Sequence, residues 1–181
     1  MSKIFFRFLL ILSVAIGILS CTRTPHDLTL AEQLMETAPD SALHILQRFQ
    51  SQKLTRASDK AYYALLMSQA LDKNDIKSES DSLIAIATGF YNESDALHAG
   101  YAWFYRARID NNRGNMNDQA KSLIKAQDYA VNVSGNKLLG MIYCDKAGMY
   151  ENQQQYDSAI CYFKKAYTAF NSWIFRSILT P

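Results

Sequence analysis

The sequence predicts an all-α protein made of repeated helical hairpins. Proline and glycine account for only 3 and 7 of the 181 residues, so few segments are forced into loops. Nearly half of the residues (49%) are hydrophobic, which is enough for a buried core. One Asp-centred pattern occurs four times, and each copy is followed by apolar residues at the three- and four-residue spacing of one helix face. A repeat period near 40 residues with two helices per unit predicts an α-solenoid of stacked antiparallel hairpins.

Residues 1–20 are expected to be a targeting segment outside the fold. Lys3 and Arg7 accompany an apolar stretch from Phe8 to Leu19, which is shorter than the roughly 20 residues of a membrane span. This arrangement is typical of a secretory signal peptide. The Ser20–Cys21 pair at its end resembles the lipobox of bacterial lipoproteins, which implies that the mature chain begins at an acylated Cys21.

An acylated Cys21 would anchor the chain without spanning the membrane, since each buried methylene contributes about 0.8 kcal/mol. The alternatives are a plain secretion signal or an uncleaved N-terminal anchor, with Cys21 incidental. Residues 21–28 are expected to be a tether. They lack the acidic run that resembles a surface-export signal. We therefore expect a lipid-anchored protein of the cell envelope that faces the periplasm, with the choice of inner or outer membrane open.

The four repeats are centred on aspartates that lie 37 to 41 residues apart, Asp40, Asp81, Asp118 and Asp157. Each aspartate is predicted to cap a helix by accepting bonds from its free N–H groups, at about 1 kcal/mol per cap. Partner helices are expected between them, over Ala57–Leu71, Ser94–Arg113 and Lys137–Asn152. In these partner helices, large residues opposite small ones would let antiparallel helices interlock. The large residues are Tyr62, Tyr63, Trp103, Tyr105 and Tyr150, and the small ones are Ala61, Ala64, Ala107 and Ala147.

The segment from Tyr143 to Ala166 resembles a tetratricopeptide repeat. The matching aromatic and small positions are Tyr143, Ala147, Tyr150, Tyr156, Ala159, Phe163 and Ala166. Lys146 replaces the preferred leucine, and Gln154 replaces the preferred glycine. A second copy matches at Trp103, Ala107, Gly114, Leu123 and Ala126, with Asp110 in place of tyrosine and Gln119 in place of alanine.

Together with the lipobox and residues 31–35 (AEQLM), these repeats resemble tetratricopeptide lipoproteins of Bacteroides-type bacteria. The resemblance implies a right-handed solenoid over residues 29–172, although residues 29–93 fit only loosely.

No residues form a recognisable catalytic, cofactor or metal motif, so we expect neither an enzyme nor a cofactor or metal. His26, His44 and His98 are scattered, and glycines do not form a phosphate loop. Removing Lys3 and Arg7 from the 19 basic residues leaves 17, which equals the 17 acidic residues, so a nucleic-acid partner is not expected. Cys144 and Cys161 are expected to be free thiols on faces that point apart.

The tetratricopeptide resemblance implies that the first helix of each repeat lines a concave binding face. In the second copy these positions are Tyr101, Phe104, Arg108, Asn111 and Asn112; in the third they are Met141, Cys144, Gly148, Glu151 and Asn152. The first set is the better candidate, because aromatic residues and Arg dominate interface energetics. The alternative is that these residues are ordinary packing residues. We expect a membrane-anchored, non-catalytic scaffold that binds a protein or peptide.

Residues 173–181 are expected to form an apolar tail with no following repeat to cover it. Trp173, Phe175 and Ile178 would fold back, self-associate or meet the membrane, or the tail is truncated or non-native sequence. If the tail is truncated, the alternative function is that of the sensory ectodomain of a membrane-bound regulator. A third candidate, a glycan-capture lipoprotein, is disfavoured by the short chain and few tryptophans.

Overall fold

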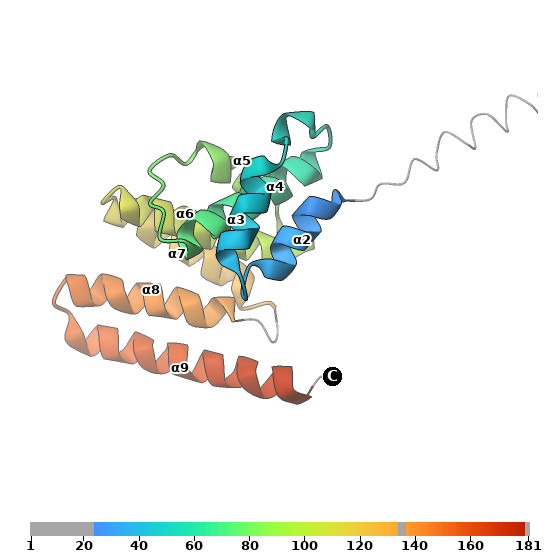
Figure 1. Ribbon diagram of the computed structural model, residues 1–181. Coiled ribbons are helices and arrows are strands. Elements are labelled where there is room, and N and C mark those ends of the chain that lie inside the picture. Colours follow the sequence, from blue (N-terminus) through green and yellow to red (C-terminus); the bar gives the residue numbers. More distant parts are fainter. Residues whose placement is uncertain (1–23, 134–136, 180–181) are drawn as a thin grey trace, which may run out of the picture.

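The protein is all-helical throughout the part that the computed structural model describes, residues 24–133 and 137–179 (Figure 1). This confirms that the fold is all-α. The expected signal segment 1–20 and Cys21 lie outside the described residues. The α-helices are α2 (His26–Leu34), α3 (Pro39–Arg48), α4 (Ala57–Lys73), α5 (Ser82–Phe90), α6 (Ala96–Asn112), α7 (Met116–Ala130), α8 (Leu138–Asn152) and α9 (Tyr156–Leu179), with short 3₁₀ helices at η1 (Ser51–Lys53) and η2 (Glu93–Asp95).

The helices pack in consecutive pairs, α2 with α3, α4 with α5, α6 with α7 and α8 with α9. The second helix of each of the first three pairs also contacts the first helix of the next pair. In Figure 1, α8 and α9 lie side by side as a two-helix layer beneath α6 and α7. The three predicted partner helices are confirmed as α4, α6 and α8, with ends that differ from the predicted ones by no more than a few residues.

The predicted aspartate caps are wrong. Asp40, Asp118 and Asp157 lie inside the first turns of α3, α7 and α9, and Asp81 precedes α5 without a side-chain cap bond. Carboxylates in a first turn still stabilise a helix, because they lie near the positive end of its dipole, at about 0.3–1 kcal/mol each.

Other side chains supply the hydrogen-bonded caps of α6 and α7. Asp95 accepts from the backbone N–H of His98 at the start of α6, and Asn115 accepts from that of Asp118 at the start of α7.

One turn geometry recurs after α4, α6 and α8 and gives the repeat its period. Asp75, Gly114 and Gln154 have positive φ values of 56°, 72° and 61°. In each case the next residue donates its backbone N–H to a carbonyl five residues earlier, as Ile76 to Leu71, Asn115 to Asp110 and Gln155 to Tyr150. Such left-handed caps favour glycine. Gln154 therefore occupies a turn conformation that favours glycine.

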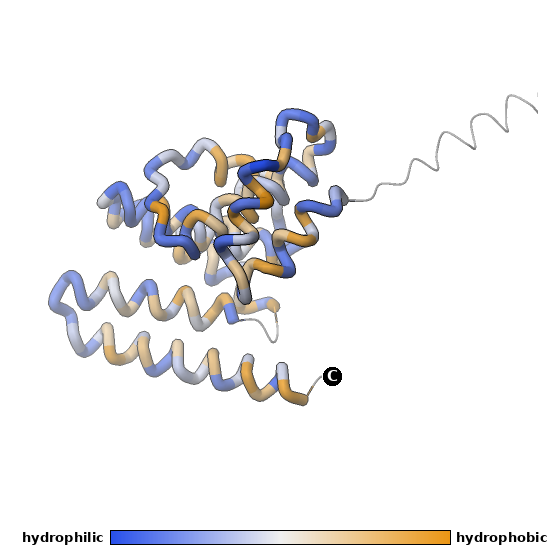
Figure 2. The backbone as a smooth tube through the Cα atoms, in the orientation of Figure 1, coloured by the Kyte–Doolittle hydropathy of each residue, from blue (hydrophilic) through white to orange (hydrophobic). Residues whose placement is uncertain are grey.

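The core consists of two clusters. One joins α2, α3 and α4 around Leu28, Leu46 and Leu66, and the other joins α4 to α8 around Tyr105 and Leu123. The predicted small residues Ala61, Ala64, Ala107 and Ala147 are all fully buried. In α9, only Ala159 and Ala166 are buried, and Figure 2 shows apolar residues along the length of this helix.

Two polar residues that depart from the repeat pattern have internal partners. Asp110, which is buried, accepts a 2.9 Å hydrogen bond from Ser122 Oγ, and this bond joins α6 to α7. Lys146 Nζ donates to Gln127 Oε1 at 2.6 Å and joins α8 to α7. These polar side chains are tolerated between the helices because each is hydrogen-bonded to a neighbouring helix.

Close approach within the last hairpin depends on Gly140. A methyl group added there would lie 2.7 Å from Phe170 Cε1, well inside van der Waals contact. At Gly148, eight residues further along α8, an added methyl group meets no atom within 4 Å. The two glycines therefore offer a matched pair of substitutions on one helix.

We predict opposite effects of alanine at these two positions. Gly140→Ala should lower the free energy of unfolding by about 1–2 kcal/mol, because Phe170 must move. Gly148→Ala should raise the free energy of unfolding by about 0.5–1 kcal/mol. Alanine leaves the unfolded chain with less backbone freedom than glycine does, and it causes no clash in the folded helix. Urea denaturation followed by circular dichroism measures both. Equal shifts of the same sign would contradict the packing of α8 on α9.

Candidate partner-binding site

The five predicted binding residues all lie on α6, but they do not share one open surface. Tyr101 is half-buried at an inner cavity, whereas Phe104 is only 3% exposed and belongs to the core. Phe104 is therefore unavailable to a partner, and its predicted binding role is corrected to packing. Asn112 Nδ2 donates to the Ser78 carbonyl at 3.2 Å, and Asn111 is exposed. Phe104 is buried because helix α6 has neighbouring helices on several sides. The family positions used to predict the binding residues describe a single face of α6 and do not show these neighbours.

Arg108 has two carboxylate partners inside the protein. Its Nε donates to Asp72 Oδ1 on α4 at 2.8 Å, and its NH1 lies 3.5 Å from Asp145 Oδ1 on α8. The expected role of Arg108, gripping a partner's carboxylate, stays a prediction, and its guanidinium, which is 39% exposed, already has two internal carboxylates. This guanidinium links the first helices of three successive hairpins.

The largely buried carboxylate of Asp145 is only partly neutralised by Arg108. One guanidinium serves two carboxylates, and Asp145 Oδ2 is buried without a hydrogen-bond partner among the described residues. Burial raises the pKa of Asp145 to about 6, against the opposing effect of Arg108. Burial and Asp145 together also raise the pKa of the neighbouring Cys144 thiol.

An inner cavity of about 320 Å³ lies where α2, α4 and α6 meet. It combines apolar walls with a few charged groups, the composition typical of ligand pockets. The two aromatic side chains at the cavity, Tyr101 and Trp173, come from α6 and α9. The residues that line it are Glu32, Met35, Glu36, Leu65, Leu66, Gln69, Leu97, His98, Tyr101, Lys137 and Trp173.

Hydrogen bonds and ion pairs fix the charged groups of the inner cavity. Glu32 Oε2 accepts a 2.6 Å hydrogen bond from the Tyr62 hydroxyl, and its Oε1 lies 3.9 Å from His98 Nε2. The His98 ring lowers the pKa of Glu32, while Glu32 and Asp95 raise the pKa of His98.

Glu36 holds the start of α8 against α2. It pairs with Lys73 at 3.1 Å and also with Lys137. Burial opposes ionisation of Glu36, but hydrogen bonds from Lys137 and Lys73 outweigh it and lower the pKa. The sequence analysis did not single out Glu36 or Lys137, which lie about a hundred residues apart, because no local pattern joins them.

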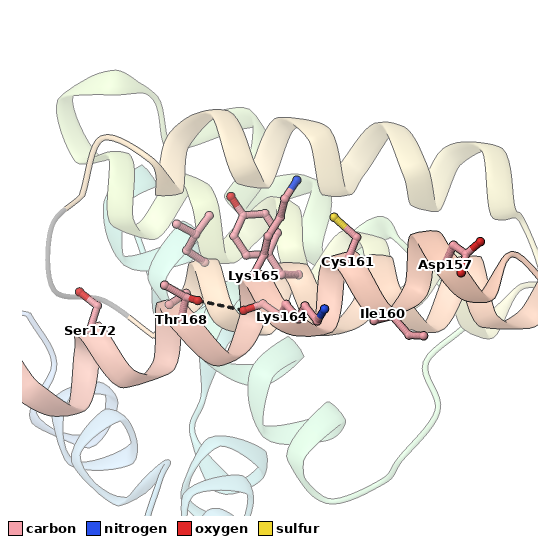
Figure 3. A pocket seen from close by; sticks show the side chains of 10 residues that line it. Asp157, Ile160, Cys161, Lys164, Lys165, Thr168 and Ser172 are labelled. Carbon is pink, nitrogen blue, oxygen red and sulfur yellow. Dashed lines mark hydrogen bonds between the residues drawn. The ribbon is translucent and has the colours of Figure 1, made fainter.

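A second depression, of about 820 Å³, lies between α8 and α9 (Figure 3). Leu139 and Tyr143 contribute from α8, and Lys164 and Lys165 from α9. Thr168 Oγ1 donates to the Lys164 carbonyl at 3.0 Å, so this threonine is held against its own helix. Cys161, also in this depression, is exposed and Cys144 is half-buried; both are free thiols, as predicted.

Within residues 24–133 and 137–179, no set of three or more His, Cys, Asp or Glu side chains could hold a metal ion. In the same part of the chain, no helix has both the length and the apolar character needed to cross a bilayer. Comparison of the chain with protein-family models, curated proteins and solved structures gave no match.

We predict that Asp145→Asn stabilises the fold at high pH only. The pKa of Asp145 is above the reference value of 3.8, so the folded protein holds this proton more tightly than the unfolded chain does. The resulting penalty is absent below about pH 4 and grows as the pH rises through about 6, toward about 2–3 kcal/mol. Urea unfolding at pH 4 and pH 8 measures it. A gain that is the same at both pH values would contradict the assigned titration.

Proposed function

We propose that this chain is a membrane-anchored, non-catalytic scaffold that binds a protein or peptide partner through tetratricopeptide-like repeats. The turn that recurs after α4, α6 and α8 supports a repeat of hairpins with one geometry. Stacked hairpins of this kind present their first helices together on one inner surface. On this proposal, α2, α4, α6 and α8 form that surface.

The observation that carries the proposal is the inner cavity. Its walls come from the first helices of three hairpins, and it holds two half-buried aromatic side chains, Tyr101 and Trp173. Aromatic residues in a partly enclosed pocket supply a large contact area at little cost in side-chain entropy. About 320 Å³ is near the lower limit for a ligand pocket and fits one or two side chains of a bound segment.

The chemistry of the inner cavity favours an apolar side chain with a polar neighbour. Leu65, Leu97 and Tyr101 offer apolar contact, and Glu32 and His98, which lie 3.9 Å apart, offer hydrogen-bonding groups. Since Glu36 is already paired with Lys73 and Lys137, it is less available to a bound cation than Glu32. We therefore propose a peptide whose apolar side chain enters the cavity and whose neighbouring donor group reaches Glu32.

The membrane anchor is the second part of the proposal. Residues 1–20 have the charge and apolar pattern of a secretory signal, and Cys21 follows a small residue, Ser20. On this proposal, acylated Cys21 fixes the scaffold to the cell envelope on the periplasmic side. Helix α2 begins at His26 and Leu28 is buried in the core, so the predicted tether is shortened to residues 21–25, which then set how far the helical domain lies from the bilayer surface.

Replacement of the anchor cysteine tests the lipoprotein assignment. Cys21→Ala should abolish incorporation of a radioactive fatty acid into the full chain in bacterial cells, because the acylated thiol is lost. The exposed Cys161 provides the control, since Cys161→Ala should leave labelling unchanged. Undiminished labelling of the Cys21→Ala protein would contradict the anchor.

Site-specific photo-crosslinking tests the inner cavity as a partner site. A benzophenone amino acid in place of Trp173 should give an adduct of defined mass in cells that make the protein naturally. The same group in place of Val131, which is 54% exposed on the C-terminal side of α7, should not. Mass spectrometry would identify the attached peptide. Equal adducts at both positions, or none at Trp173 while the protein remains folded, would contradict the proposed site.

A further inference from the structure

One face of α9 exposes a row of large apolar side chains. This row, the α9 stripe, contains Tyr156, Ile160, Phe163, Tyr167, Ile174 and Ile178, whose exposed fractions run from 44% at Phe163 to 76% at Ile178. The neighbouring face of the helix carries Ala159 and Ala166, both buried against the rest of the protein. Helix α9 therefore has two apolar faces, of which the described part of the chain covers one.

The spacing along the α9 stripe is that of a helix-pairing seam. From Tyr156 the steps are four, three and four residues, to Ile160, Phe163 and Tyr167. Alternating steps of four and three keep a side-chain row facing a second helix over several turns. Helices α3, α5 and α7 each contact the first helix of the next hairpin, whereas no later hairpin follows α9 in the described residues.

The charges beside the α9 stripe point to a second copy of the same helix in the opposite direction. Asp157 follows Tyr156 and Lys164 follows Phe163, so both lie on the same edge, seven residues apart. In an antiparallel pair of identical helices, like edges face each other. The Asp157 edge position of one copy then lies beside the Lys164 position of the other, twice by symmetry.

We propose that two copies of this chain associate through an antiparallel pair of α9 helices. The two-fold axis passes between Ile160 and Phe163, so that Ile160 of one copy packs on Phe163 of the other and Tyr156 packs on Tyr167. The opposite charges at Asp157 and Lys164 select this register. A shift that placed Asp157 opposite Asp157, or Lys164 opposite Lys164, would bring like charges together. This inference is independent of the proposed partner site.

The size of the seam indicates a weak dimer. Four partly exposed large side chains from each copy would bury roughly 800 Å² in total, which is at or below the low end for specific interfaces. We therefore expect a dissociation constant in the micromolar range for freely diffusing chains. If both copies are held on one membrane, confinement raises their effective concentration and favours the pair.

The test is sedimentation equilibrium of the full chain in a detergent of matched density, over a concentration series. We expect a monomer–dimer equilibrium that Ile160→Lys abolishes. Ile124→Lys, at a residue of matching exposure on α7, should leave the dissociation constant unchanged within about two-fold. Lys164→Glu and Asp157→Lys should each raise the dissociation constant by about ten-fold, and the double variant should restore it.

Three results would overturn the proposal. The first is a monomer throughout the concentration series. The second is a dimer unaffected by Ile160→Lys, which would place the contact elsewhere. The third is a double charge variant no better than the single ones, which would exclude the antiparallel register. Circular dichroism spectra of all variants must match the unaltered protein, and photo-crosslinking at Trp173 remains a separate measure of partner binding.

Discussion

The close approach of neighbouring helices, which small side chains permit, is the constraint on which the rest of this structure depends. Helices α2, α3 and α5 have only nine or ten residues, too few to be stable alone, so their stability must come from packing against neighbouring helices. Fully buried alanines such as Ala64, Ala107 and Ala147 remove bulk where helices meet. Gly100 does the same on α6, where an added methyl group would lie 2.8 Å from Leu138 Cδ2. Because the helix backbones lie this close, the space left between them is filled by a few large buried side chains such as that of Tyr105.

Close packing also brings charged groups into contact across hairpins, and this determines the polar character of the inner helices. Arg108 joins Asp72 to Asp145, and Glu36 joins Lys73 to Lys137, so each bridge connects three helices or helix ends. Glu36 and Lys137 of the second bridge also line the inner cavity, together with Glu32 and His98. Partly buried charge pairs of this kind contribute more to geometry than to net stability.

Local features were predictable from sequence, whereas contacts between distant residues were not. The spans of α4, α6 and α8 follow from stretches rich in aromatic residues and alanine that lie between the repeated aspartate motifs. The aspartate caps failed because periodicity places a helix but does not fix which residue begins it. The internal carboxylate partners of Arg108 were not predicted, because a helix face can be recognised without knowledge of what packs against it.

Hydrogen exchange of the full chain, followed by mass spectrometry, tests most directly whether packing between hairpins holds the fold together. Helix α6 contacts α4, α5, α7 and α8, whereas α9 contacts chiefly α8. Packing between neighbours therefore predicts the slowest exchange in the buried segment from Ala99 to Ile109 and faster exchange in the C-terminal turns of α9. Exchange in α6 as fast as in the C-terminal turns of α9 would contradict the account.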